Sequence, residues 1–298
     1  MRKFEYVWLD GYIPEPSLRS KVKIDNHAGV WSFDGSSTEQ ATGDKSDCIL
    51  NPVAEYKTID RIRADATQTG PGLEGTYVMC EVLTANHDNH PSNTRIYCEN
   101  LVTPEWWFGF EQEYFMYQNG RPLGWPEKGK PRAQGDYYCG VGEGNVVGRE
   151  IVDRHTEACM NAGIGITGTN AEVALGQWEF QVLGSGIRAG DDLWMARYIL
   201  QRIAERHGVS IDFRPKPQAG DWNGSGMHTN FSNDEMRYQG TENLMENTCM
   251  KLALTHSKAI KEYGSDNAKR LTGKHETQSI EKFSYGVSDR GASIRIPI

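Results

Sequence analysis

Two glutamates, Glu111 and Glu113, stand two positions apart in segment 107–117, which is rich in aromatic and large apolar residues. That composition is typical of a β-strand, in which alternate residues share a face, so both carboxylates should project side by side. Neighbouring carboxylates resist burial unless a cation or a proton lies between them. Composition alone favours two solvated glutamates. Carboxylates and a histidine on later segments instead lead us to interpret the pair as one edge of a divalent-metal site.

Two later segments, 170–173 and 176–182, are also typical of strands, and they carry Glu172 and Glu179. In the second segment, polar residues alternate with apolar ones, as expected for a half-buried antiparallel sheet whose polar side lines a cavity. The glycine-rich stretch 221–232 then places three polar side chains on one strand face: His228, Asn230 and Ser232. The four glutamates with His228 form an oxygen-rich set that suits Mg²⁺ or Mn²⁺ better than structural zinc.

Three arginines, Arg270, Arg290 and Arg295, follow near the end of the sequence. A lone arginine there would be a solvated surface charge, but three of them beside a metal cluster resemble an anion clamp. Two metals with arginines form the arrangement that phosphoryl transfer needs.

The surrounding elements predict an α+β fold, with helices covering one face of an antiparallel sheet. Strands are expected at 4–9, 18–24 and 77–82, an exposed loop at 60–75, and helices at 149–162, 192–205 and 241–263. We expect Asp191 or Asp192 to cap the second helix and His155 to lie on the surface or boundary of the first. Residues 163–168 match a dinucleotide fingerprint as a string, but they follow a helix, so we reject that interpretation. A small β-rich N-terminal domain, 1–90, and a larger domain, 91–298, are predicted.

The composition narrows the class of protein. The formal charge is −8, which disfavours a nucleic-acid partner, since that would call for a basic patch. Six cysteines are scattered without a Cys-x-x-Cys pair, which indicates reduced thiols in a cytosolic protein. No apolar run approaches membrane-spanning length. We expect a cytoplasmic protein without a membrane or nucleic-acid partner.

Beyond these patterns, the chain resembles glutamine synthetase, in particular its shorter, eukaryotic-like type II branch. Matching strings run in family order across nearly the whole chain: WSFDGSST, WFGFEQEYF, PLGWP, QGDYYCGVG, NAEV, GQWEFQV, PKP, DWNGSGMHTNFS, RLTGKHET and YGVSDRGASIRIP. The resemblance implies a β-grasp-like N-terminal domain and a larger catalytic domain. It also implies a homo-oligomer of stacked rings, expected to be a decamer, with each site between adjacent subunits.

The resemblance assigns the metal ligands position by position. Glu113, Glu172 and Glu179 would hold one Mg²⁺ or Mn²⁺ beside the glutamate substrate. Glu111 and His228 would hold the other, beside the phosphates of the co-substrate ATP. Glu111 and Glu179 thereby also belong to the ATP site.

Substrate-binding and nucleotide-binding residues follow from the same comparison. Asn223 and Gly224 match the segment that grips glutamate, and Arg270 matches an arginine that pairs with its carboxylate. Asn230, Phe231 and Ser232 match part of the nucleotide site.

Four residues match catalytic positions. Arg290 and Arg295 correspond to arginines that contact ATP and stabilise the transferring phosphoryl group. Glu276 corresponds to the glutamate of a mobile flap that shields the intermediate from water. Asp34 corresponds to the aspartate that helps deprotonate ammonium, and it would serve the neighbouring subunit's site.

The implied reaction joins glutamate and ammonia through an acyl phosphate formed from ATP. The family continues past the RIP string to a segment ending Glu-Asp-Arg-Arg-Pro, so we expect the 298 residues to be C-terminally truncated. Two alternatives stay open: a γ-glutamylamide ligase that uses another amine, and a catalytically silent, ring-forming homologue.

Overall fold

The computed structural model describes residues 1–60, 73–99 and 101–297. The chain divides into two compact units, each assembled from three stretches of sequence. Unit 1 comprises Met1–Pro104, Ile151–Ile166 and Val182–Ile203, and unit 2 comprises Glu105–Glu150, Thr167–Gln181 and Ala204–Ile298. The domain boundary between residues 90 and 91 remains a prediction.

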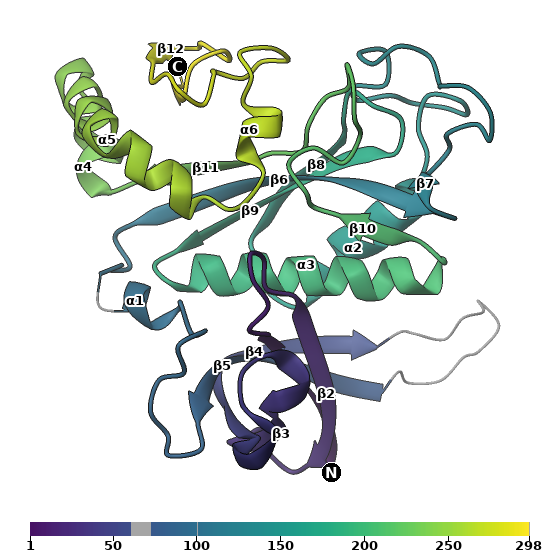
Figure 1. Cartoon of the computed structure of the whole chain (residues 1–298), viewed down its shortest axis with the longest axis vertical. Coiled ribbons are helices and arrows are strands. Elements are labelled where there is room, and N and C mark those ends of the chain that lie inside the picture. Colours follow the sequence, from purple (N-terminus) through teal and green to yellow (C-terminus); the bar gives the residue numbers. More distant parts are fainter. Residues whose placement is uncertain (61–72, 100, 298) are drawn as a thin grey trace. The chain divides into compact units, whose positions relative to one another are not determined.

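Unit 1 contains a five-stranded sheet in the order β2-β1-β5-β4-β3 (Figure 1). The strands are β1 (Arg2–Leu9), β2 (Leu18–Asp25), β3 (Trp31–Asp34), β4 (Asp47–Asp60) and β5 (Leu73–Thr84). β1 runs parallel to β5, whereas the β1–β2, β3–β4 and β4–β5 pairs are antiparallel. Alternate residues of β1, namely Phe4, Tyr6 and Trp8, are buried in one apolar core because the strand period places them on the same face. Three short helices follow β3 or β5: η1 (Gly35–Thr38), η2 (Gly43–Lys45) and α1 (Ile96–Glu99).

Most of helices α2 (Arg149–Asn161) and α3 (Arg188–Arg206) belongs to unit 1. α2 buries Ile151, His155 and Cys159, which recur every four residues and therefore share one helix face. The prediction that His155 lies at the helix surface or boundary is wrong, since its side chain is fully buried. Its ring Nε2 instead contacts the backbone oxygen of Ala196 at 3.0 Å.

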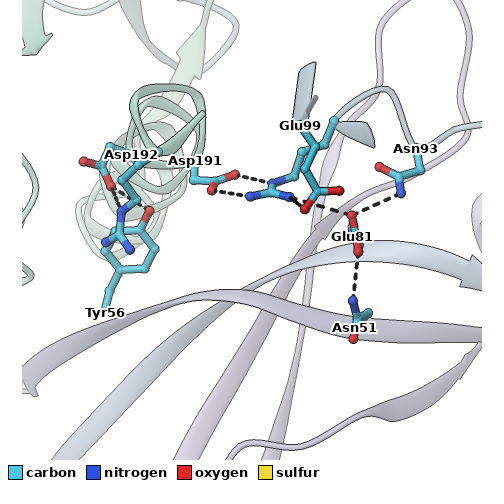
Figure 2. A network of polar contacts seen from close by, with 9 residues as sticks. Asn51, Tyr56, Glu81, Asn93, Glu99, Asp191 and Asp192 are labelled. Carbon is cyan, nitrogen blue, oxygen red and sulfur yellow. Dashed lines mark hydrogen bonds and ion pairs between the residues drawn. The ribbon is translucent and has the colours of Figure 1, made fainter. Parts of the chain in front are cut away.

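A polar network explains why α3 begins four residues earlier than predicted (Figure 2). Asp191 lies within its first turn, Asp192 follows, and both are buried, so neither is the residue before the helix. Asp191 accepts two hydrogen bonds from Arg95, at 2.9 and 3.1 Å. Asp192 accepts one from the Tyr56 hydroxyl at 2.7 Å and one from Arg188 Nε at 2.6 Å. These carboxylates serve tertiary contacts instead of a helix cap.

Unit 2 is built around the long strand β6 (Trp107–Gln118), as Figure 1 shows. Its sheet has the order β10-β6-β9-β8, and β7 and β11 also pair with β6. The partner strands are β7 (Arg121–Pro122), β8 (Ile166–Ala171), β9 (Gln177–Ser185), β10 (Ser210–Asp212) and β11 (Met227–Ser232). β10 and β11 run antiparallel to β6, at its C-terminal and N-terminal halves respectively.

The remaining helices and strands of unit 2 follow β11 in sequence. It comprises α4 (Asp234–Gln239), α5 (Glu242–Glu262), α6 (Asn267–Arg270), β12 (Tyr285–Val287) and β13 (Ile294–Ile296). β12 and β13 form a small parallel pair. α5 has a side-chain cap, because Thr241 accepts a hydrogen bond from the backbone N–H of Leu244.

The α+β class, the predicted helices and most of the predicted strands are confirmed, with the earlier start of α3 as the main shift among the helices. The strand predicted at 170–173 is wrong in its bounds, because β8 ends at Ala171 and Glu172 lies after it. Residues 163–165 connect α2 to β8 and residues 166–168 begin that strand, so the segment follows a helix and the rejection of a dinucleotide motif holds. Of the predicted loop at 60–75, Asp60 ends β4 and Leu73 begins β5, while 61–72 lie outside the described residues. Among the described residues, no helix combines the length and apolar character needed to cross a membrane.

Candidate active site

The pairing of β6 with β11 brings two predicted metal ligands together. His228 lies directly opposite Glu111 in the antiparallel register, and Asn230 lies opposite Gly109. His228 Nδ1 is 3.5 Å from Glu111 Oε2, and Asn230 Nδ2 donates to Glu111 Oε1 at 2.9 Å. The contact with His228 is the largest influence that lowers the pKa of Glu111 to about 2. This carboxylate is therefore charged across the physiological range.

Three further glutamates converge in the interior of unit 2. Glu113 comes from β6, Glu172 follows the last residue of β8, and Glu179 comes from β9. One carboxylate oxygen of each lies within 4.8 Å of those of the other two. All three side chains are buried, with 6–7% of their surface exposed. We call these residues the carboxylate triad.

Burial and mutual repulsion dominate the electrostatics of the carboxylate triad. Loss of hydration, followed by the charges of Glu113 and Glu179, raises the pKa of Glu172 to about 7. Loss of hydration also raises the pKa of Glu113 and of Glu179. Three buried carboxylates at this spacing favour either protons or a hard cation that takes oxygen ligands.

Each triad carboxylate is oriented by a neighbouring donor. The backbone N–H of Gly226 donates to Glu113 Oε2 at 2.6 Å. Asn170 Nδ2 donates to Glu172 Oε1 at 2.9 Å, and Gln181 Nε2 donates to Glu179 Oε1 at 2.8 Å. Such partners fix the geometry of ligands around a metal. Asn170 and Gln181 were not among the predicted site residues, although each stands two positions from its glutamate and Gln181 shares a strand face with Glu179.

Arg270 lies directly against the glycine-rich segment before β11. A Cβ atom on Gly226 would come within 2.4 Å of Arg270 Nη2, and one on Gly224 within 2.7 Å of Arg270 Cγ. A Cβ atom on Gly224 would also lie 2.5 Å from the backbone oxygen of Pro215, so glycine is required there, whereas at Gly226 a side chain would displace the Arg270 guanidinium. The Arg270 charge opposes the rise in the pKa of Glu113, which places a cationic group beside the carboxylate triad.

The other predicted arginines are exposed. The charge of Arg295 contributes to lowering the pKa of Glu111. Arg290 instead lies near Tyr138. The pKa of Tyr138 is raised chiefly by Cys139, and the charge of Arg290 opposes that rise. Glu276 is exposed in the loop between α6 and β12.

The predicted nucleotide-binding residues lie on β11, where Asn230 and Phe231 are exposed and Ser232 is half-buried. Arg237 donates to the Ser232 hydroxyl at 3.0 Å, which fixes that side chain. Asn230 is committed to Glu111 through the hydrogen bond described above.

Asp34 belongs to unit 1 and ends β3. Its carboxylate accepts hydrogen bonds from Ser36 N at 3.0 Å, Ser36 Oγ at 2.6 Å and Ser37 Oγ at 2.9 Å. These bonds, led by the Ser36 hydroxyl, lower the pKa of Asp34. The structure thus places an exposed, fully ionised carboxylate in an Asx-type turn.

Comparison with known proteins identifies the family of the chain. A family model described as "Glutamine synthetase, catalytic domain" matches residues 99–298. Glutamine synthetase of Bradyrhizobium diazoefficiens is 50% identical over 308 aligned residues, which cover 99% of this chain and 86% of the relative. Glutamine synthetase of Schizosaccharomyces pombe is 47% identical, with 98% and 82% covered. "Glutamine synthetase 1, mitochondrial" of Drosophila melanogaster is 45% identical, with 98% and 74% covered. The chain therefore belongs to the glutamine synthetase family.

Proposed function

We propose that this chain ligates ammonia to L-glutamate with ATP, giving L-glutamine, ADP and phosphate. The observation that carries the proposal is the buried carboxylate triad beside Arg270 in a chain of the glutamine synthetase family. The triad offers a site for a cation, and the arginine offers a site for a substrate carboxylate.

The donor set fits a divalent metal, since the triad is oxygen-only and its members have raised pKa values that a cation would reverse. We assign Glu113, Glu172 and Glu179 to one Mg²⁺ or Mn²⁺, and Glu111 with His228 to a second. When bound, such ions neutralise the phosphate oxygens of ATP.

In the first step, the protein binds and orients glutamate and ATP. Arg270, with Asn223 and Gly224, holds the substrate so that a side-chain carboxylate oxygen faces the γ-phosphorus. That oxygen forms a bond to phosphorus while the bond from phosphorus to the bridging oxygen breaks and ADP leaves. Arg290 and Arg295 stabilise the charge on the transferring group, and γ-glutamyl phosphate results.

In the second step, the intermediate must meet ammonia before water. Glu276 on its loop shields the acyl phosphate, and Asp34 accepts a proton from ammonium. The ammonia nitrogen then attacks the acyl carbon, the bond from that carbon to the phosphate oxygen breaks, and the nitrogen loses a second proton to the departing phosphate. Glutamine is the product, and one ATP is consumed for each amide formed.

The test measures phosphate and glutamine with ATP, Mg²⁺ and glutamate, with and without ammonium. We expect ammonium-dependent glutamine formation by the wild-type chain, and its loss in Glu113→Gln. Glu157→Gln, an exposed position on α2, is the matched control and should behave as the wild type. Glutamine formation unaffected by Glu113→Gln would contradict the role of the triad. ATP consumption faster with methylamine than with ammonium would instead identify a γ-glutamylamide ligase.

We further propose that the chain works in the cytoplasm as a homo-oligomer of stacked rings. Family membership supports the assembly, and the scattered, unpaired cysteines support a reducing compartment. If the assembled chain released no phosphate under any of these conditions, the chain would be a catalytically silent, ring-forming homologue.

A further inference from the structure

The loop that carries Glu276 is closed by its own contacts. Thr272 and Ser279 form an antiparallel bridge, and the Ile280 N–H donates to Leu271 O at 2.9 Å. We call residues 271–280 the Glu276 loop. Inside it, the buried Thr277 hydroxyl donates to Lys274 O at 2.8 Å, which draws the tip into a tight turn.

Two consecutive residues at the tip have left-handed backbone conformations. The φ angles are 55° at His275 and 57° at Glu276. Such angles are unfavourable for residues with a Cβ atom, and they persist where surrounding contacts hold them. Some interaction must therefore stabilise this tip, and the Glu276 side chain is exposed.

The His275 ring supplies that interaction by joining two other segments of unit 2. Its Nε2 is 2.9 Å from Asp221 Oδ1, and its Nδ1 is 3.1 Å from Gln134 Nε2. The other end of the same amide, Gln134 Oε1, accepts from the Asn223 N–H at 2.6 Å. A continuous path of hydrogen bonds thus runs from the Glu276 loop to the segment that we assign to glutamate binding.

The directions of these hydrogen bonds determine the protonation of His275. The Asn223 backbone N–H is a donor, so the group of Gln134 that faces it must be the carbonyl oxygen. The amide NH₂ of Gln134 therefore points at His275 Nδ1, which must accept. In this arrangement Nδ1 carries no proton, and Nε2–H donates to Asp221.

We propose that His275 is a positioning residue. Held between Asp221 and Gln134 as a neutral imidazole, it fixes the backbone of Glu276 and couples that residue to glutamate bound at Asn223. This inference rests on the proposed function for the role of Glu276. Loosening His275 should let water reach the acyl phosphate and should weaken glutamate binding, while leaving the carboxylate triad in place.

The variants separate the two hydrogen bonds of the ring. His275→Leu removes both. Gln134→Leu removes the donor to Nδ1 together with the acceptor for Asn223 N–H. Asp221→Ala removes the acceptor for Nε2–H. Asp221→Asn retains an acceptor and should keep the Glu276 loop in place. Glu281→Gln, an exposed position just after the loop, is the control.

The first measurement needs no activity. Trypsin cleavage after Lys274, at the loop tip, is followed by mass spectrometry in the substrate-free protein, relative to cleavage after the exposed Lys128. His275→Leu loses the hydrogen bond to the charged Asp221, so trypsin should cleave after Lys274 about tenfold faster in this variant. Asp221→Asn and Glu281→Gln should match the wild type. The melting temperature of each variant shows that the fold is retained.

The second measurement is the ratio of phosphate released to glutamine formed, with the KM for glutamate. We expect His275→Leu, Gln134→Leu and Asp221→Ala to raise both this ratio and the KM, and Asp221→Asn to raise neither. Unchanged cleavage and an unchanged ratio in His275→Leu would overturn the proposal, as would equal defects in Asp221→Asn and Asp221→Ala. If the wild type forms no glutamine, the proposed function fails, and the cleavage comparison alone decides whether His275 holds the loop.

Discussion

Glu111 and Glu113 occupy the same face of one strand, yet their environments shift their pKa values in opposite directions. Glu111 is paired with His228 and Asn230, which favour its charged form. Glu113 is buried with two other carboxylates, which favours its neutral form. A bound cation should therefore stabilise the charged form of Glu113 more than that of Glu111. A cation at Glu113 relieves a repulsion that the protein has not itself neutralised.

Glu172 should respond most clearly to metal, because burial and its two neighbours raise its pKa to about 7. Replacing it by glutamine removes one buried negative charge. We expect Glu172→Gln to raise the melting temperature of the metal-free protein while reducing the further increase caused by Mn²⁺. Differential scanning fluorimetry with and without Mn²⁺ measures both, and Glu157→Gln serves as the control. An unchanged Mn²⁺ response in Glu172→Gln would contradict the metal assignment.

His155 should make the protein sensitive to acid. Complete burial lowers its pKa from 6.5 to about 4, since desolvation disfavours the imidazolium. Between these two values the unfolded state binds more protons, so stability is present above pH 6.5 and declines as the pH falls toward 4. The loss from this residue should be on the order of 3 kcal/mol.

Urea unfolding at pH 7.5, 5.5 and 4.5 measures the acid effect. His155→Gln has no ionisable ring and should show a shallower decline over this range, whereas His27→Gln, at an exposed position, should follow the wild type. Parallel curves for His155→Gln and the wild type would show that the buried ring does not set the acid sensitivity.

The polar network of Figure 2 attaches α3 to the rest of unit 1. Arg95 bonds Asp191 through two hydrogen bonds and also lies 3.8 Å from Glu81 of β5 and 3.9 Å from Glu99. Asp191 is 4% exposed. We expect Arg95→Met to cost about 3–5 kcal/mol, because it leaves a buried carboxylate without its main partner.

The double variant Arg95→Met/Asp191→Asn separates charge from packing. It should recover much of the loss, since a neutral amide is less costly to bury than an unpaired carboxylate. Midpoints of urea unfolding for the two single variants and the double variant complete the cycle. Equal destabilisation of Arg95→Met and the double variant would indicate lost packing instead of an unpaired charge.

Strand periodicity predicted much of unit 2, but not the contacts between distant segments. The alternation in 107–117 placed Glu111 and Glu113 on one face, and the structure confirms that arrangement. The same rule could have identified Gln181, which shares a strand face with Glu179. By contrast, the burial of His155 and the start of α3 depend on partners far along the chain, such as Ala196 and Arg95, which no local pattern contains. The contacts of His275 are unpredictable for the same reason, since they join segments 54 and 141 residues away.

In an assembled ring, the site could receive Asp34 from its own chain or from the neighbouring subunit. Family resemblance implies that it comes from the neighbour, and the Asp34 carboxylate is exposed and held in an ionised state by Ser36 and Ser37. Asp34→Asn and Glu113→Gln should each abolish glutamine formation when assembled alone. Unfolding and refolding the two variants together in equal amounts mixes them within each ring. Some sites then combine the intact Asp34 of one variant with the intact Glu113 of the other.

With random assembly, the subunit that supplies Asp34 has that residue intact half of the time, and the subunit that supplies Glu113 likewise. About a quarter of the sites are therefore intact. We therefore expect the mixed assembly to recover up to about a quarter of wild-type glutamine formation. Mixing the two variants after assembly is the control and should recover none, provided that subunits do not exchange. Recovery by neither mixture, with rings visible by light scattering, would place Asp34 at the site of its own chain, since two inactive chains could then never complete a site together.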